Sequence, residues 1–287
     1  PISSANLRLK NIEMSTSNLQ TITPPDFPLT DNGRKRFLYI LVALAGSLVF
    51  ITTFFLLIEI LDRTLRDPIR SKRLTGLPVI AAFNGISNLK FRGFLRMCNR
   101  IAAGYCCRQL NKFLQPGRPT VINLLSMEPR EGKSFLTKYF ADYWKTEGLR
   151  VRIVRSDVDF EPHTPEYINA RQLSDFWSRN NAEQEADIIL VEYPAANRSS
   201  LPLEVLKKAD VNLLVANACR LWRDSDEATL QPIKEALKDT PFFLYLNNAD
   251  RDVVESFTGD LPPRTPIHSL FSRLSQLGLT SQKAAVK

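Results

Sequence analysis

The sequence predicts an α/β protein in which one transmembrane helix is followed by a doubly wound parallel sheet. A long apolar run near the start of the chain predicts the helix, and short aliphatic runs that alternate with stretches of helical spacing after residue 118 predict the sheet. The first of these aliphatic runs leads into a Gly-Lys-Ser sequence. The 287 residues suffice for both parts, and a hydrophobic fraction of 44% excludes disorder of the whole chain.

Residues 1–36 are predicted to be an extracytoplasmic, proline-rich lead-in. Pro24, Pro25 and Pro28 precede the turn-forming sequence 31–33, and such a stretch favours extended chain and turns over helix. The chain begins with Pro1 and shows no signal-peptide pattern. We therefore expect this segment to be the end of a longer extracytoplasmic region.

Residues 37–61 are predicted to be the transmembrane helix. Glu59 is the only charged residue in this stretch of twenty-five, which exceeds the ~20 residues that a helix needs to cross a bilayer core. The alternative is a buried core helix, which is usually shorter. Basic residues at 34–36 precede the span, and a larger basic group follows it: Arg63, Arg66, Arg70, Lys72 and Arg73. This asymmetry places the C-terminal side in the cytoplasm.

Residues 62–118 are predicted to be a basic juxtamembrane linker with helices. They contain twelve Lys or Arg against two Asp, a net charge of +10, whereas the whole chain carries +8. Membrane lipids with anionic headgroups are the expected partners of this charge, and a merely solvated basic face is the alternative. No nucleic-acid partner is expected, because no nucleic-acid-binding motif accompanies the charge.

Residues 119–287 are predicted to be the cytoplasmic sheet domain. Helical stretches separate five runs that are typical of buried parallel strands, namely Val121–Leu125, Val151–Val154, Ile188–Val191, Val211–Val215 and Phe242–Leu246. Ligands of such sheets bind at the carboxyl ends of the strands. We therefore look for functional residues directly after these runs.

The loop after the first run is a candidate phosphate-binding loop (P-loop). Its residues 126–134 end in Gly-Lys-Ser, although Met127 stands where the usual first glycine would be. In a P-loop, backbone N–H groups cradle phosphate, the lysine reaches the β and γ oxygens and the serine hydroxyl ligates Mg²⁺. The alternative is a chance loop with an exposed lysine. The predicted residues that bind the cofactor ATP are Arg130, Glu131, Gly132, Lys133 and Ser134.

Acidic residues at two other strand ends are candidate ligands of Mg²⁺. Asp157 and Asp159 follow the second run and Glu192 follows the third. Together with Ser134, these carboxylates could hold the metal directly or through water. The alternatives are a turn or helix cap for Asp157 and Asp159, and a hydrogen-bonding strand end for Glu192.

Three phrases extend the interpretation beyond the P-loop: 25–28 (Pro-Asp-Phe-Pro), 61–68 (Leu-Asp-Arg-Thr-Leu-Arg-Asp-Pro) and 74–80 (Leu-Thr-Gly-Leu-Pro-Val-Ile). With the P-loop, they resemble the bacterial polysaccharide co-polymerases, or chain-length determinant proteins, that carry a C-terminal tyrosine-autokinase-type P-loop domain. The resemblance covers nearly the whole chain. It implies a first transmembrane helix and a periplasmic domain upstream, and a homo-oligomer in the bacterial inner membrane. It also implies a role in the chain length and export of a surface polysaccharide or exopolysaccharide, with the polymerase and export machinery as partners.

The chain departs from the family pattern at positions that matter for catalysis. In the family, the first Asp of an Asp-x-Asp pattern closes the second strand. An ungapped match places Arg155 at that first position and Asp157 at the second, whereas a shift of two residues places Asp157 first and Asp159 second. Both alignments stay open. Glu192 stands where the family has Asp, and no tyrosine follows Tyr245, whereas the autokinases carry a tyrosine cluster in their tail.

These departures favour a degenerate domain, a pseudokinase that binds ATP without transferring phosphate, and no catalytic residue is assigned. One alternative is an active protein-tyrosine kinase or ATPase of the same pathway, with Asp157 or Asp159 as metal ligand and base. Another is a membrane-tethered P-loop ATPase that positions cellular machinery.

Overall fold

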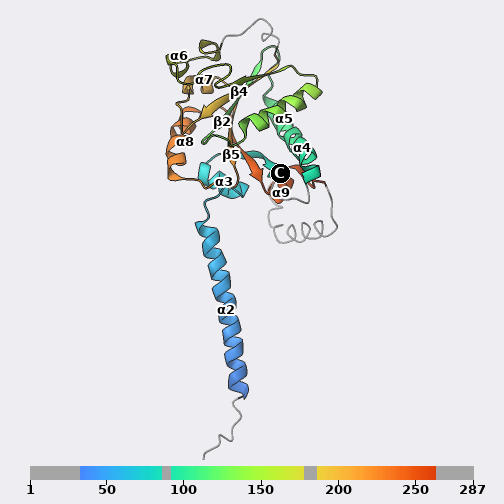
Figure 1. Ribbon diagram of the computed structural model, residues 1–287, viewed down its shortest axis with the longest axis vertical. Coiled ribbons are helices and arrows are strands. Elements are labelled where there is room, and N and C mark those ends of the chain that lie inside the picture. The colour runs from blue at the N-terminus through green and yellow to red at the C-terminus, as the bar shows by residue number, and fades with distance from the viewer. Residues whose placement is uncertain (1–32, 86–91, 178–185, 263–287) are drawn as a thin grey trace, which may run out of the picture. The chain divides into compact units, whose positions relative to one another are not determined.

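The computed structural model describes residues 33–85, 92–177 and 186–262 of the chain. The chain divides between Leu61 and Asp62 into two compact units. The first contains the long helix α2, Gly33–Leu61, and the second contains the sheet (Figure 1).

Helix α2 confirms the predicted helix and begins four residues before the predicted start at 37. Over Lys35–Leu61 its mean hydropathy is 2.5, which makes it the one helix among the described residues that is long and apolar enough to cross a membrane. Every side chain from 35 to 61 is exposed, so α2 is not a core helix. The hydroxyls of Ser47 and Thr52 donate to carbonyls one turn earlier, at 2.8 and 2.7 Å, so their polar groups are satisfied within the helix.

Six parallel strands form the sheet of the second unit, in the order β1-β6-β5-β2-β4-β3. The predicted doubly wound parallel fold is therefore confirmed. The strands are β1 (Val79–Asn84), β2 (Thr120–Ser126), β3 (Val151–Arg155), β4 (Ile188–Ala195), β5 (Val211–Asn217) and β6 (Phe242–Ala249). Five of them contain the predicted runs, and β1 was not predicted.

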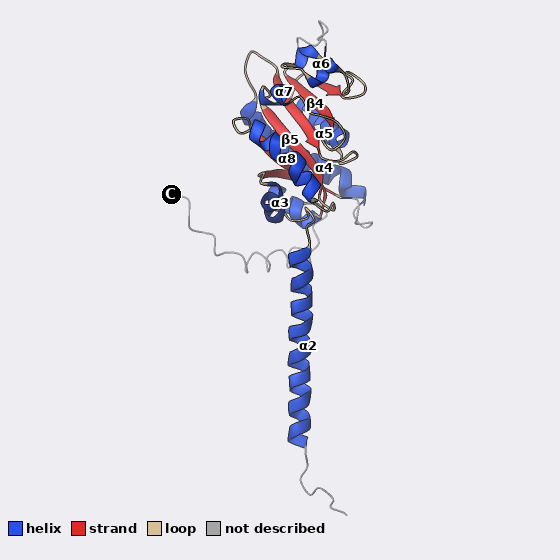
Figure 2. Cartoon of the chain, turned by 90° about the vertical axis from the view of Figure 1, so that its left-hand side faces the viewer, coloured by secondary structure: helices blue, strands red, loops and turns tan. Residues whose placement is uncertain are grey.

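Helices cover both faces of the sheet (Figures 1 and 2). Because crossovers between parallel strands are right-handed, the connections from β1 to β2 and from β2 to β3 lie on one face, and those from β4 to β5 and from β5 to β6 lie on the other. The α-helices of the second unit are α3 (Pro68–Thr75), α4 (Arg92–Leu110), α5 (Lys133–Thr146), α6 (Pro165–Ile168), α7 (Leu203–Lys207), α8 (Asp224–Ala236) and α9 (Arg251–Thr258). Two 3-10 turns add η2 (Asn111–Phe113) and η3 (Leu173–Asp175).

The second unit begins at Asp62, although residues 62–118 were predicted as a linker with helices ahead of a domain that starts at 119. Leu65 is fully buried, and Thr64 forms a β-bridge with Leu221. Strand β1 pairs with β6, and α4 packs against both β1 and α5. The local pattern did not reveal this, because the bridge from Thr64 to Leu221 and the pairing of β1 with β6 join residues more than a hundred positions apart.

Helix α5 follows the P-loop and is held by its apolar face. Leu136, Phe140 and Trp144 recur every four residues and are at most 1% exposed. The ring of Phe140 meets those of Trp144 and Tyr245 edge to face, with centroids 5.7 and 5.9 Å apart. This packing presents the first turn of α5 at the carboxyl edge of the sheet.

Candidate functional site

The candidate site is the loop between the end of β2 at Ser126 and the start of α5 at Lys133. It lies at the carboxyl edge of the sheet, between the ends of β4 and β5, which are the two neighbours of β2. The chain leaves β2 toward one face of the sheet and leaves β4 and β5 toward the other. This reversal is the topological feature that opens a ligand crevice in doubly wound sheets.

Two residues of the loop have a left-handed backbone conformation. Gly132 has φ +99°, and a Cβ there would clash with the side-chain amide of Asn247. Arg130 adopts φ +63° without being glycine, which costs on the order of 1 kcal/mol or more and must be held by its surroundings. The Asn247 amide holds the loop from β6, because its Nδ2 donates to the carbonyl oxygen of Glu131 at 2.9 Å.

The first turn of α5 is available to bind an anion. Gly132 is the N-cap and supplies no side-chain hydrogen bond to the helix. The first N–H groups of a helix have no partner inside it and carry its positive partial charge. They point into the loop, as in proteins that bind phosphate at a helix N-terminus.

Lys133 lies inside this loop rather than in solvent. Its Nζ donates to Ser126 Oγ at the end of β2, and Ser126 Oγ donates in turn to the carbonyl oxygen of Glu128 at 2.8 Å. Burial lowers the pKa of the Lys133 ammonium, while the carboxylates of Glu131 and Glu192 act in the opposite direction. The hydrogen bond to Ser126 therefore holds the Lys133 side chain within the loop.

The side chain of Glu131 turns inward and fastens the loop. Oε2 accepts hydrogen bonds from the backbone N–H groups of Met127 and Glu128 at 3.0 and 3.1 Å. Oε1 accepts from Arg220 Nη1 at 2.8 Å. Burial raises the pKa of this carboxyl, and the Arg220 charge lowers it less. Glu131 was predicted as a cofactor-binding residue. Its side chain is bound to the loop and to Arg220, so only its backbone could contact a cofactor.

Arg220 connects the loop to helix α8. Its second terminal nitrogen pairs with Asp226, which is fully buried. Asp226 also accepts from Asn197 Nδ2 at 2.8 Å and from the Arg223 backbone N–H at 2.9 Å. The network therefore joins the P-loop to the chain after β4 and to the start of α8, and local sequence patterns did not indicate it.

Ser134 and Glu192 are in direct contact, as expected of a P-loop serine and a strand-end acid. Ser134 Oγ donates to Glu192 Oε2 and Thr137 Oγ1 donates to Oε1, both through short hydrogen bonds. Glu192 is 4% exposed and lies within β4, which runs three residues beyond it. The structure thus brings together two of the four predicted metal ligands.

Asp157 and Asp159 do not bond to Ser134 or to the side chain of Glu192 in the described part of the chain. Asp159 Oδ2 accepts from the Arg155 backbone N–H at 2.8 Å, and Oδ1 lies 3.5 Å from Arg152 Nη2. Asp159 is therefore a turn cap, which was the structural alternative for this residue. Asp157 is exposed, with φ +65°.

The strand register decides between the two alignments of this segment. β3 ends at Arg155, whose partner in the parallel pairing with β4 is Glu192. Arg155, and not Asp157, therefore closes the strand, as in the ungapped match. Arg155 Nε lies 3.4 Å from Glu192 Oε1, so a guanidinium stands beside the strand-end carboxylate.

These residues do not fit an Mg²⁺ ion. Among the residues that the structure describes, no three His, Cys, Asp or Glu side chains are placed to share a metal. The Glu192 carboxylate is already bound to two hydroxyls and a guanidinium. Mg²⁺ demands oxygen ligands in near-octahedral geometry, usually one or two carboxylates with waters and substrate phosphates, and the one carboxylate that Ser134 contacts in the described part of the chain already has protein donors on both oxygens.

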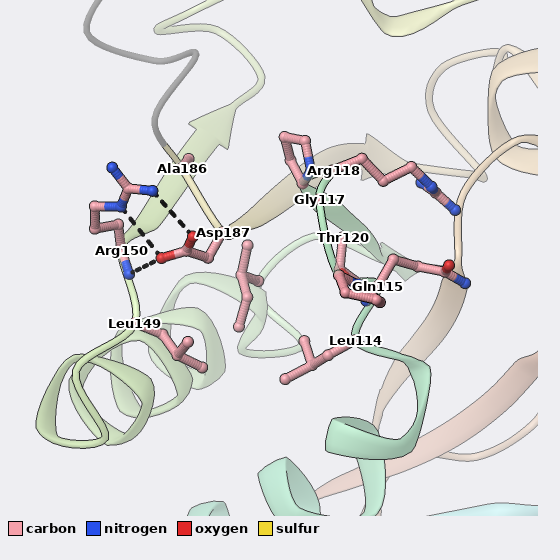
Figure 3. A pocket seen from close by; sticks show the side chains of 12 residues that line it. Leu114, Gln115, Gly117, Arg118, Thr120, Leu149, Arg150, Ala186 and Asp187 are labelled. Atoms are coloured by element: carbon pink, nitrogen blue, oxygen red, sulfur yellow. Dashed lines mark hydrogen bonds and ion pairs between the residues drawn. The ribbon is translucent and has the colours of Figure 1, made fainter.

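Two of the cavities in the described part of the chain lie at opposite edges of the sheet. Figure 3 shows the first, of about 350 Å³, at the amino ends of β2 and β4, where Arg150 and Asp187 are bonded to each other. The second, of about 460 Å³, adjoins the P-loop and is lined in part by Asn84, Asn217 and Asn247. Only the second is close to the candidate site.

Besides the Arg220 network, the sequence analysis missed the site residues Thr137 and Asn247. Thr137 lies three residues after Ser134 on α5 and therefore on the same side of the helix. That spacing could have identified it. No local signal marks Asn247, because its role depends on β6 lying near the loop.

No protein-family model matches the chain, and no curated protein matches it in sequence. Solved structures resemble it at low identity. The kinase domain of the Escherichia coli tyrosine kinase ETK is 13% identical, with a TM-score of 0.47 over 64% of this chain and 94% of that domain. The chimerical protein CapA2B2 is 17% identical, with a TM-score of 0.45 over 64% of this chain and 100% of that one. The BceF tyrosine kinase domain is 14% identical, with a TM-score of 0.43 over 64% and 98%.

Proposed function

We propose that this chain is a membrane-anchored regulator of surface polysaccharide or exopolysaccharide chain length and export, whose sheet domain binds ATP without transferring its phosphate. One observation carries the ATP-binding part: Lys133 and Ser134 open α5 directly after a buried parallel strand, and Ser134 contacts the acid of the neighbouring strand, Glu192. The polysaccharide part is supported by the resemblance of the phrases 61–68 and 74–80.

The loop has the properties that a triphosphate requires. The N-terminus of α5 offers uncapped N–H groups, and Lys133 adds a positive charge that lies partly out of water, where its attraction to an anion is stronger. The inward turn of Glu131 toward Arg220 removes that carboxylate from the space above the helix terminus. ATP is the proposed ligand, with its phosphates at residues 130–134.

We infer from the same site that the domain does not transfer phosphate. Transfer depends on positioning and on neutralising the charge that develops in the transition state, usually with Mg²⁺. Asp159 is used as a turn cap, Asp157 is exposed, and Arg155 occupies the strand end that faces Glu192. This arrangement supports ATP binding as a structural or regulatory event rather than an active kinase.

The anchor and the partners complete the proposal. Helix α2 is apolar on every side and would hold the protein in the bacterial inner membrane, with the sheet domain in the cytoplasm. The basic residues after the span would contact anionic lipids. We propose a homo-oligomer that acts with the polysaccharide polymerase and export machinery, and in which bound ATP biases assembly.

Calorimetric titration of the full chain in detergent with ATP tests the binding. Lys133→Ala should weaken ATP by at least about tenfold, or about 1.4 kcal/mol. Lys145→Ala is the matched control, because Lys145 lies exposed in the last turn of the same helix. Absence of heat at millimolar ATP would overturn the proposed ligand.

A cellular experiment tests the pathway and the orientation. Deleting the gene should change the length distribution of a surface polysaccharide, and Lys133→Ala should reproduce part of that change. Protease added outside right-side-out spheroplasts should leave residues beyond 62 intact. Their digestion, or an unchanged polysaccharide, would contradict the membrane regulator.

A further inference from the structure

Three protein donors contact the carboxylate of Glu192. One oxygen accepts from Ser134, and the other accepts from Thr137 and lies 3.4 Å from Arg155 Nε. The side chain of Glu192 is 5% exposed, so water contributes little. A metal ion at this carboxylate would therefore compete with these three donors.

Arg155 brings a positive charge to the place where a metal ion would sit. It pairs with Glu192 across β3 and β4, and its side chain is 45% exposed. Within the described ranges no partner is found for its two terminal guanidinium nitrogens, which leaves their N–H groups open to a ligand. A guanidinium fits phosphate oxygens through paired hydrogen bonds and stays charged at all physiological pH values.

Two other carboxylates near the loop are already paired. Glu131 is bound to Arg220 and to two backbone N–H groups, and Asp159 is bound to Arg152 and to the Arg155 backbone. A divalent cation beside Glu192 would therefore meet the like charge of Arg155 with a single occupied carboxylate to hold it. An anionic phosphate would meet two cations, Lys133 and Arg155.

We propose that Arg155 replaces the divalent cation, so that this P-loop binds a nucleoside triphosphate without Mg²⁺. Lys133, Arg155 and the first N–H groups of α5 neutralise the phosphates, and Glu192 orients Arg155 and Ser134 toward them. The inference rests on the proposed function, since it requires that the loop binds ATP. Beyond that function, it names Arg155 as the residue that supplies the positive charge and states that ATP binding does not require Mg²⁺.

The test compares the dissociation constant of ATP for the full chain in detergent, measured by calorimetry with excess Mg²⁺ and with excess EDTA. The two constants should agree within about threefold. Arg155→Ala should weaken binding in EDTA by at least about tenfold. Its fold should persist, because the side chain is nearly half exposed, and circular dichroism checks this.

Arg150→Ala is the matched control. It removes the same charge just ahead of β3, at the opposite edge of the sheet, where Arg150 pairs with Asp187. ATP affinity should not change. Arg155→Asp is the converse variant, because it places a second carboxylate beside Glu192. It should bind ATP poorly in EDTA and recover at least about tenfold when Mg²⁺ is added.

The outcomes separate this inference from the function on which it rests. ATP binding that requires Mg²⁺ in the wild type, or that is insensitive to Arg155→Ala, overturns the inference and leaves ATP binding intact. No ATP binding in either buffer overturns the proposed function, and the inference with it.

Discussion

The side-chain amide of Asn247 donates to the carbonyl oxygen of Glu131 at 2.9 Å and thereby ties the end of β6 to the P-loop. The two residues are 116 positions apart in the chain. The amide approaches the loop so closely that a side chain at position 132 would collide with it. The geometry of the loop therefore depends on a strand that is not adjacent to β2 in the sheet.

Gly132→Ala should damage the loop more than an ordinary left-handed glycine substitution. Gly132 has φ +99° and its new Cβ would meet Asn247, whereas Gly117 has φ +83° with open space around it. We expect Gly117→Ala to cost about 1 kcal/mol of unfolding free energy and Gly132→Ala to cost clearly more. Urea denaturation of both variants measures the difference. Equal losses would show that the contact with Asn247 is unimportant.

Arg220→Met should strongly destabilise the domain. Arg220 pairs with Glu131, which is 3% exposed, and with Asp226, which is fully buried. Removing the guanidinium leaves two buried carboxylates without their charged partner, and breaking a buried pair costs about 3 to 5 kcal/mol.

Arg150→Met is the control for this loss. The Arg150 side chain is 58% exposed and its partner Asp187 is 38% exposed, so the expected cost is about 0 to 1 kcal/mol. Chemical denaturation followed by tryptophan fluorescence compares the two variants. Similar midpoints would contradict a structural role of the Arg220 network.

Glu131 should make the stability of the domain depend on pH. Burial raises the pKa of this carboxyl above its ordinary value of 4.5, so the folded state binds its proton more tightly than the unfolded state does. The contribution of Glu131 is fully present below pH 4.5 and is lost as pH rises through the raised pKa.

The comparison with Glu131→Gln isolates this contribution, because other carboxyl groups titrate in both proteins. The unfolding free energy of the wild type minus that of the variant should fall as pH rises from about 4.5 into the neutral range. Denaturation curves at a series of pH values provide it. A difference that is constant or that rises with pH would contradict the raised pKa.

A fragment of residues 62–287 should fold, and a fragment of residues 119–287 should not. The shorter fragment lacks β1, which pairs with β6, and α4, which packs on α5. It also lacks Phe83 of β1, whose ring centroid lies 5.4 Å from that of Tyr245, so the buried ring of Tyr245 would be exposed. Circular dichroism and thermal unfolding distinguish the fragments. A cooperative transition in the shorter one would support a domain boundary near 119.

Local patterns predicted much of this fold. β2 and β5 were predicted because buried parallel strands are continuous aliphatic runs. The site residues Lys133 and Ser134 were predicted because a phosphate loop needs a glycine and a helix start at fixed spacing. β1 was missed. Its six residues follow Pro78, and only their pairing with β6 shows that they form a strand.

Hydrophobic periodicity and backbone conformation act over a few residues, and they were therefore sufficient to predict the apolar helix α2, five strands and the Gly-Lys-Ser turn. Two contacts became known only from the folded chain: Arg155, rather than Asp157 or Asp159, faces Glu192, and Arg220 reaches Glu131 across 89 positions. Those contacts depend on strand register and on the packing of distant segments. Electrostatic pairing of this kind cannot be predicted from neighbours in the chain.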